Sequence, residues 1–180
     1  MQTVTLYTVG HSNRSVAELI ALLKTVGVTT LVDVRAQPAS ARYPQFAMEA
    51  LRAALEGQDM IYHWAGRQLG GLRQPRANSA HIALDSGGFR GFADHMETEA
   101  FQRGASQLIN LGMKAPTAFM CAEKLPAQCH RSLIADYLTL KGVNVVHLIA
   151  PGESHAHQLH AGARLESEKL IYDRQTSRPL

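Results

Sequence analysis

The chain has 180 residues, 46% of them apolar, which is enough for one well-packed domain and too little for two. A net charge of +3 and a pI near 9.0 favour anionic ligands, and two cysteines are too few for a secreted disulfide scaffold. Because no apolar run approaches the ~20 residues that cross a bilayer and the first residues lack a signal-peptide pattern, we expect a cytoplasmic protein with reduced thiols and no membrane contact.

The first half of the chain predicts alternating strands and helices. Apolar runs bounded by turn residues predict strands over 4–9, 30–34 and 60–64. A capping box at Ser15 and Glu18 begins a first helix that ends near Gly27, and 48–56 is a second helix. Two strands joined by a helix in this way form a right-handed parallel unit.

The second half predicts a long connection followed by two further helices and two strands. Residues 66–91 are rich in Gly, Arg, Gln, Asn and Ser and lack helical or strand period over most of their length, which is typical of a functional or mobile loop. Helical spacing covers 92–111 and returns in the segment that begins after His130, with strands at 117–120 and 143–149. Residues 151–180 are expected to form a polar tail, loosely packed on the 1–150 domain or extending from it, with three solvated histidines.

This alternation predicts an α/β fold. Strands that are apolar along their whole length are buried on both faces, so we expect three α/β/α layers and a mostly parallel sheet of about five strands with helices on both faces. Ligands of such sheets bind beyond the carboxyl ends of the strands. The polar residues at those ends are therefore expected to converge at one rim: His11, Ser12, Asp33, Arg35 and Glu123.

The segment from Cys121 to Asp136 holds both cysteines and leads into a predicted helix. A helix N-terminus stabilises an anion and lowers the pKa of a thiol there, so Cys129, beside His130 and Arg131, is predicted to be a thiolate nucleophile or a redox thiol. The alternative is a buried, inert cysteine. The order Cys-His-Arg-Ser also differs from the Cys-x5-Arg loop of thiol phosphatases and rhodaneses, so the mechanism of those enzymes is not implied.

Two arginines at the rim, Arg131 and Arg35, are predicted to bind an anionic ligand, because a guanidinium can donate two parallel hydrogen bonds to a phosphate or carboxylate. Each could instead make an internal salt bridge, and Asp33 is expected to orient an arginine rather than act on a substrate. The predicted ligand-binding set is Arg131, Arg35, Ser12, Asp33 and His130.

Glu123 and His11 join Cys129 as candidate catalytic residues, since carboxylates and imidazoles at a sheet rim are suited to general acid or base chemistry. Each has a structural alternative, in which Glu123 orients an arginine and His11 satisfies backbone carbonyls in a turn. A metal site at Cys121 and Cys129 is a weaker alternative, because their spacing does not match the C-x2-C pairs of structural zinc sites. The basic residues of the 66–91 connection could hold a nucleic-acid backbone, form a lid or serve as solubility charge.

Four motifs occur together in chain order: YTVGHSNR at 7–14, VDVRAQP at 32–38, QLGG at 68–71 and the segment 121–137. Over roughly residues 5 to 150 the chain therefore resembles the domain-of-unknown-function 488 family of bacterial and archaeal proteins. The resemblance implies an α/β fold and an uncharacterised activity, so it assigns no catalytic residue.

The favoured hypothesis is an enzyme that acts on a small anionic or nucleotide-like substrate through a Cys-His-Arg site at the carboxyl edge of the sheet. One alternative is a non-catalytic module that binds nucleic acid or a nucleotide, and another is a metal-binding protein that uses Cys121 and Cys129. A third is a regulatory or structural protein in which the motif only ties the helix to the sheet. The sequence does not identify the substrate, a cofactor or the oligomeric state.

Overall fold

The computed structural model describes residues 3–174 and contains a six-stranded sheet with the order β3-β2-β4-β1-β5-β6. Five of its strands run parallel, and β6 adds antiparallel to β5 at one edge. The strands are β1 (Thr5–Gly10), β2 (Thr30–Asp33), β3 (Ile61–Trp64), β4 (Thr117–Cys121), β5 (Asn144–Ala150) and β6 (Glu153–Ala156). The mostly parallel sheet that the sequence predicts is confirmed, and the sixth strand comes from the predicted tail.

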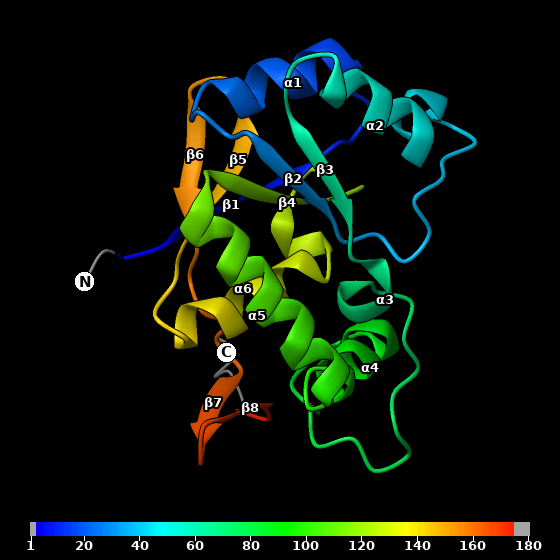
Figure 1. Ribbon diagram of the computed structural model, residues 1–180. Coiled ribbons are helices and arrows are strands. Elements are labelled where there is room, and N and C mark those ends of the chain that lie inside the picture. The colour runs from blue at the N-terminus through cyan, green and yellow to red at the C-terminus, as the bar shows by residue number, and fades with distance from the viewer. Residues whose placement is uncertain (1–2, 175–180) are drawn as a thin grey trace.

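Helices cover both faces of this sheet, so the predicted three-layer α/β/α arrangement is also confirmed (Figure 1). One face carries α1 (Val16–Lys24) and α2 (Met48–Glu56). The other carries α3 (Gly66–Leu69), α4 (Gly87–His95), α5 (Glu99–Lys114) and α6 (Arg131–Leu140). None of the described helices is long and apolar enough to span a membrane.

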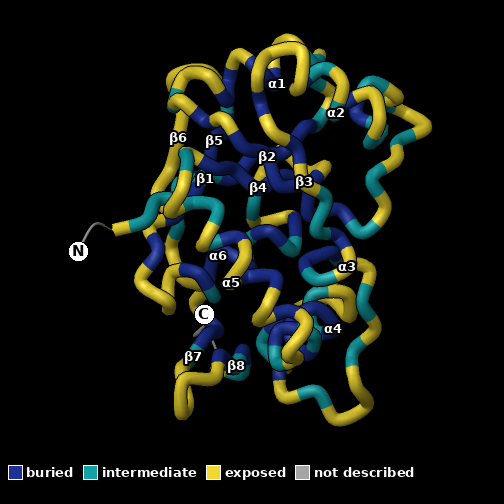
Figure 2. Tube along the Cα trace, viewed as in Figure 1, coloured by how far each residue is buried: buried dark blue, intermediate teal, exposed yellow. Residues whose placement is uncertain are grey.

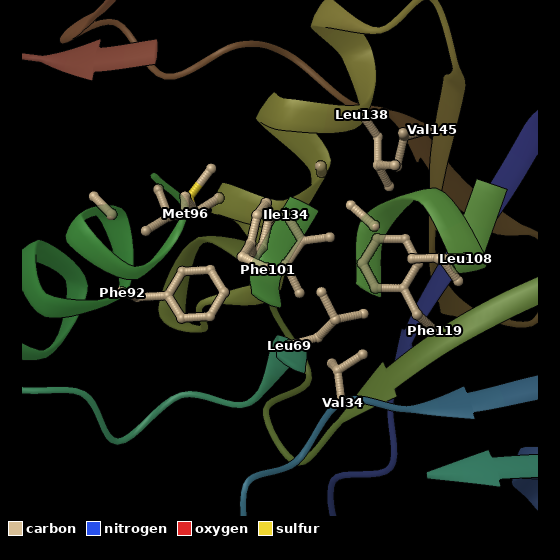
Figure 3. Packing of buried hydrophobic residues seen from close by; sticks show 14 of the residues in the cluster. Val34, Leu69, Phe92, Met96, Phe101, Leu108, Phe119, Ile134, Leu138 and Val145 are labelled. Carbon is tan, nitrogen blue, oxygen red and sulfur yellow. The ribbon is translucent and has the colours of Figure 1, made fainter. Parts of the chain in front are cut away.

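The strands lie at the centre of the molecule, between two hydrophobic clusters (Figure 2). The larger cluster joins α4, α5 and α6 to the sheet through Phe92, Phe101 and Ile134, all fully buried (Figure 3). Burial of one such side chain stabilises the fold by about 1.5–3 kcal/mol relative to its exposure. The helices beside the carboxyl ends of the strands are therefore held rigidly.

Local signals account for the helix boundaries, including the start of α5, which the prediction from sequence did not place. The Ser15 Oγ accepts the Glu18 amide at 3.0 Å and the Glu18 carboxylate accepts the Ser15 amide at 3.0 Å, as the capping box predicts. The single helix predicted over 92–111 is wrong, because the Thr98 side chain caps a separate helix, α5. The preceding connection is also less irregular than expected, since it contains α3 and the start of α4.

The predicted tail packs closely on the domain over its described residues. Its strands β7 (Ala163–Glu166) and β8 (Lys169–Tyr172) form an antiparallel hairpin, and Tyr172 is 1% exposed. The Tyr172 hydroxyl donates to Asp136 Oδ2 on α6 at 2.7 Å. The expected loose packing is therefore wrong for this hairpin, whereas residues 175–180 lie outside the described part of the chain.

One of the tail histidines is buried in a chain of hydrogen bonds rather than solvated. His157 Nε2 donates to Asp136 Oδ1 at 2.6 Å, and His157 Nδ1 lies 2.8 Å from His147 Nε2. His147 Nδ1 lies 2.6 Å from Thr8 Oγ1 in the middle of the sheet. These contacts join the tail to α6, β5 and β1, whereas His155 is exposed as expected.

The chain changes direction between β1 and β4, which are neighbours in the sheet. From β1 it passes through α1 to β2, over one face of the sheet, and from β4 it passes through α6 to β5, over the other. The two connections therefore leave the carboxyl ends of these strands in opposite directions. Such a point opens a crevice in α/β sheets and is where their ligands bind.

Candidate functional site

The crevice at the carboxyl ends of β1, β2 and β4 brings together most of the predicted site residues. His11 follows β1, Arg35 follows β2 and Glu123 follows β4. The His11 amide donates to the Cys121 carbonyl at 2.9 Å, which continues the β1–β4 pairing past the ends of the strands. The convergence expected from the sequence is thus present in the structure.

Two adjoining cavities open at this crevice. The first, of ≈ 430 Å³, is lined by Cys121, Cys129 and His130, and we call it the thiol cavity. The second, of ≈ 500 Å³, is lined by His11, Ser12, Arg42 and Lys124, and we call it the basic cavity. Their shared wall consists of Arg35, Gln37, Ala39, Ala122, Glu123 and Gln128. Together they form the rim cleft.

Both cysteines are buried in one cluster with Arg131, and both are free thiols. Arg131 Nη1 donates to Cys121 Sγ at 3.1 Å, and the Arg131 amide donates to Cys129 Sγ at 3.3 Å. The two thiols therefore share Arg131 as a hydrogen-bond donor. They meet because a 3₁₀ turn at Pro126–Gln128 returns the chain from the end of β4 to the start of α6.

This cluster holds one negative charge on two sulfurs. Burial raises the pKa of Cys121, but hydrogen bonds and charge from Cys129 and Arg131 outweigh burial and lower that pKa to about 7. The hydrogen bond to Cys121, together with burial and the Cys121 charge, raises the pKa of Cys129, since two adjacent thiolates would repel. The thiolate is therefore on Cys121, and the expectation of a lowered pKa at Cys129 is wrong.

Arg131 is fully buried and contacts neither cavity, so it acts on the thiols rather than on a ligand from solvent. Its guanidinium also donates to the carbonyls of Glu123 at 2.9 Å and Lys124 at 3.2 Å. The first-turn amide that was expected to hold an external anion is likewise used by Cys129 Sγ. The anion at this helix N-terminus is thus the protein's own sulfur pair.

The His130 ring presents an unprotonated nitrogen to the Cys129 thiol. Its Nε2 lies 3.0 Å from the Val34 carbonyl, which only accepts hydrogen bonds, so Nε2 carries the proton and Nδ1 is free. Nδ1 lies 3.6 Å from Cys129 Sγ, and burial lowers the pKa of His130 to about 4, which keeps the ring neutral. The adjacent side chains converge because Cys129 is extended, with φ −141° and ψ 148°, just before α6.

On the other side of the cleft, Asp33 orients Arg35. The Arg35 Nε and Nη2 atoms donate to the two Asp33 carboxylate oxygens at 2.9 and 2.7 Å, and Tyr62 donates to the same carboxylate at 2.5 Å. Arg35 Nη1 lies 3.4 Å from His11 Nε2, and Arg35 forms part of the wall that the two cavities share. Arg35 is therefore fixed with one edge toward both cavities, while Asp33 lies behind it.

His11 and Glu123 differ in how freely they could act on a ligand. His11 Nδ1 donates to the Ser12 carbonyl at 2.9 Å, its ring stacks on Phe46, and burial lowers its pKa. Both ring nitrogens are therefore engaged, as in the structural alternative. The Glu123 side chain is exposed in the shared wall, and Ser12, with φ +49°, faces the basic cavity from a left-handed turn.

Several residues of the cleft carried no signal in the sequence. Gln37 and Gln128 lie in the shared wall, and Arg42 and Lys124 supply the exposed charge of the basic cavity. Each is a single polar residue in a connection, so only the folded chain brings them together. The position of Cys121 at the end of a buried strand placed it at the rim with Glu123, but the only role predicted for its thiol was that of a metal ligand.

The basic residues of the 66–91 connection are used within the protein. Arg73 donates to the Gly70 and Arg67 carbonyls, and Arg67 lies over the Trp64 ring. Arg76 pairs with Asp94 and with Glu97. These contacts weigh against a free basic lid or nucleic-acid surface.

Two clusters contain metal-ligand types of side chain, and cations already occupy both. His81 Nε2 lies 3.6 Å from Asp94 and from Glu97, but these carboxylates bind Arg76 and Lys169. His81 Nδ1 accepts the Tyr172 amide, so Nε2 carries the proton and cannot coordinate. At the thiol pair, the buried guanidinium of Arg131 stands where a divalent cation would have to bind. The geometry therefore weighs against the metal alternative.

The fold and the site define a three-layer α/β protein with a buried thiol pair at the switch point of a mostly parallel sheet. The chain belongs to the family described as domain of unknown function DUF488, whose match covers residues 15–138. The resemblance expected from the four motifs is thus confirmed. The match includes both cysteines, Arg35 and Arg131, and begins after His11 and Ser12. No curated protein and no solved structure matches the chain.

Proposed function

We propose that the protein is a thiol-dependent enzyme that acts on a small anionic substrate in the rim cleft. The observation that carries this proposal is the placement of both cysteines on the wall of one cavity, with a fully buried arginine bound to both sulfurs. A buried cation that stabilises a thiolate makes the sulfur nucleophilic at neutral pH. A purely structural tie between helix and sheet would not require a charge at this position.

Within this proposal the two cysteines have different roles. Cys121 holds the thiolate at rest and is the first nucleophile, because the guanidinium donates directly to its sulfur. Cys129 keeps its proton while Cys121 is ionised, and its sulfur lies 3.6 Å from the neutral His130 ring. Arg131 and Asp33 are positioning residues, the first for the thiolate and the second for Arg35.

An anionic substrate suits the charges of the basic cavity. Arg35 is held with one edge toward the cleft, and Arg42 and Lys124 add two exposed cations on the same wall, against one exposed carboxylate, Glu123. A charged cleft with low-dielectric walls raises the local concentration of ions of opposite sign. Ser12 and Gln128 offer further hydrogen-bond donors to a bound phosphate or carboxylate.

Alkylation with two reagents tests the thiolate and the anion site separately. Iodoacetamide is neutral and reports the thiolate alone, so its rate in the wild type should rise through pH 7 and should be lost in Cys121→Ser. Iodoacetate carries a carboxylate, so Arg42→Ala and Lys124→Ala should slow iodoacetate more than iodoacetamide. Arg103→Ala, an exposed arginine on α5, is the matched control. Wild-type alkylation that follows a pKa of about 8.5, the value of a free cysteine, would refute the proposal.

A further inference from the structure

The arrangement of the two sulfurs points to a more specific chemistry at this site. We propose that Cys121 and Cys129 form a dithiol and disulfide couple that reduces hydroperoxides entering the thiol cavity. This inference rests on the proposed thiolate nucleophile but not on the anionic substrate, and it gives the same sulfur a further substrate class. Both sulfurs border the same cavity and both accept a hydrogen bond from Arg131, so an oxidised Cys121 would have a resolving thiol beside it.

The chain between the cysteines permits the sulfurs to close a bond. Cys121 ends a buried strand and is fixed, whereas Cys129 is a single extended residue between a short 3₁₀ turn and α6. The connection between them, residues 122–128, is exposed apart from the half-buried Pro126. Ring closure therefore moves a surface connection and leaves the hydrophobic core in place.

The residues around the pair supply what a two-step oxidation requires. The Cys121 thiolate attacks the peroxide oxygen, a sulfur–oxygen bond forms, the oxygen–oxygen bond breaks, and the alkoxide leaves and takes up a proton as the alcohol. Cys129 then attacks Cys121 Sγ, which forms the disulfide and breaks the sulfur–oxygen bond, while the Cys129 proton goes to the departing hydroxide, which leaves as water. The pair thereby loses two electrons and the single proton of Cys129, a second proton comes from solvent, and the peroxide becomes an alcohol and water.

Arg131 determines how strongly oxidising this couple is. The guanidinium is fully buried and its anionic partner is the Cys121 thiolate. Formation of the disulfide removes that anion and leaves a buried cation with carbonyl partners at Glu123 and Lys124. A couple whose reduced form is stabilised in this way is a strong oxidant, so small thiols should reduce the disulfide readily and complete a peroxidase cycle.

Oxidation of the purified full chain with equimolar hydrogen peroxide tests the proposal, and the two cysteines make the result easy to assign. We expect both free thiols to disappear together, at least ten times faster than free cysteine reacts, and a Cys121–Cys129 link in the non-reduced peptide map. Cys129→Ser should stop at a sulfenic acid on Cys121 that dimedone traps, and Cys121→Ser should react slowly. Oxidation no faster than free cysteine, or fast oxidation without the link, would refute the inference.

Alkylation of the same samples separates this inference from the proposed function. Fast alkylation of Cys121 at pH 7 without an internal disulfide would refute the dithiol and disulfide couple but support the proposed nucleophile. Slow alkylation would refute both proposals. Equilibration with reduced and oxidised glutathione supplies the second measurement. The wild-type disulfide should be more oxidising than glutathione, and folded Arg131→Lys, whose amine cannot reproduce the guanidinium contacts, should be less oxidising than wild type. A wild-type disulfide less oxidising than glutathione would contradict the role given to Arg131.

Discussion

Replacing Arg131 with methionine should remove most of the reactivity of the thiol pair at neutral pH. The guanidinium lies 3.1 Å from Cys121 Sγ and, together with Cys129, holds the pKa of this thiol at about 7, below the usual value of about 8.5. Each unit by which that pKa rises disfavours the thiolate by about 1.4 kcal/mol. A return of the pKa to about 8.5 would lower the thiolate fraction at pH 7 from about half to about 3%, so alkylation by iodoacetamide should slow by about 15-fold.

The rate should be measured from pH 5 to 10 in Arg131→Met, with circular dichroism and thermal unfolding to establish that the variant is folded. Loss of the guanidinium leaves the Glu123 and Lys124 carbonyls without this donor, whereas it also removes the cost of burying a charge. Arg103→Met on exposed α5 controls for the loss of a positive charge. A folded Arg131→Met protein whose alkylation still titrates near pH 7 would refute the reasoning.

Three further perturbations probe the surroundings of the site. A Cβ at Gly10 would lie 1.7 Å from a carbonyl oxygen of the connection between β4 and α6, so Gly10→Ala should lower the thermal midpoint and abolish fast alkylation. Gly57→Ala should do neither, because its Cβ would make only ordinary contacts, the nearest at 3.5 Å. Burial lowers the pKa of His147 to about 3, so below pH 6.5 the unfolded chain binds a proton that the folded protein does not. His147 should therefore lower the free energy of unfolding by about 2 kcal/mol between pH 6.5 and 5, in addition to the loss from the buried His130. In urea titrations His147→Asn should reduce the total loss by that amount, whereas His155→Asn should leave it unchanged. The Asp136 carboxylate accepts three hydrogen bonds, and Asp136→Asn replaces one of its oxygens with an amide group that cannot accept. Hydrogen exchange should therefore accelerate in the β7–β8 hairpin and stay unchanged in α1.

The fold was predictable because its signals are local. Apolar runs marked the five parallel strands, and the capping box at Ser15 fixed the start of α1 within a few residues. Thr98 was a cap of the same type, but apolar spacing on both sides of it concealed the break between α4 and α5. The β7–β8 hairpin was missed because its buried residues, such as Tyr172, are few and separated by polar ones.

The candidate site was only partly predictable, because its chemistry depends on contacts between distant residues. The rule for carboxyl ends of strands located His11, Arg35 and Glu123 correctly at one rim. It could not show which way Arg131 points, and an arginine in the first turn of a helix is compatible with a solvent ligand or with the interior. The thiolate was predicted at Cys129 because, in the sequence, this cysteine is the one next to a helix N-terminus, His130 and Arg131.

The buried guanidinium explains why the charge is on the other cysteine. The α6 N-terminus offers Cys129 one amide, a fractional positive charge, whereas the side chain of the same arginine offers Cys121 a full positive charge at 3.1 Å. Since two adjacent thiolates repel, the stronger donor decides which sulfur ionises. The backbone amide of Arg131 therefore favours a thiolate on Cys129, whereas the side chain of the same residue favours a thiolate on Cys121. A variant that keeps the helix but moves the guanidinium should raise the pKa of Cys121 and lower the pKa of Cys129.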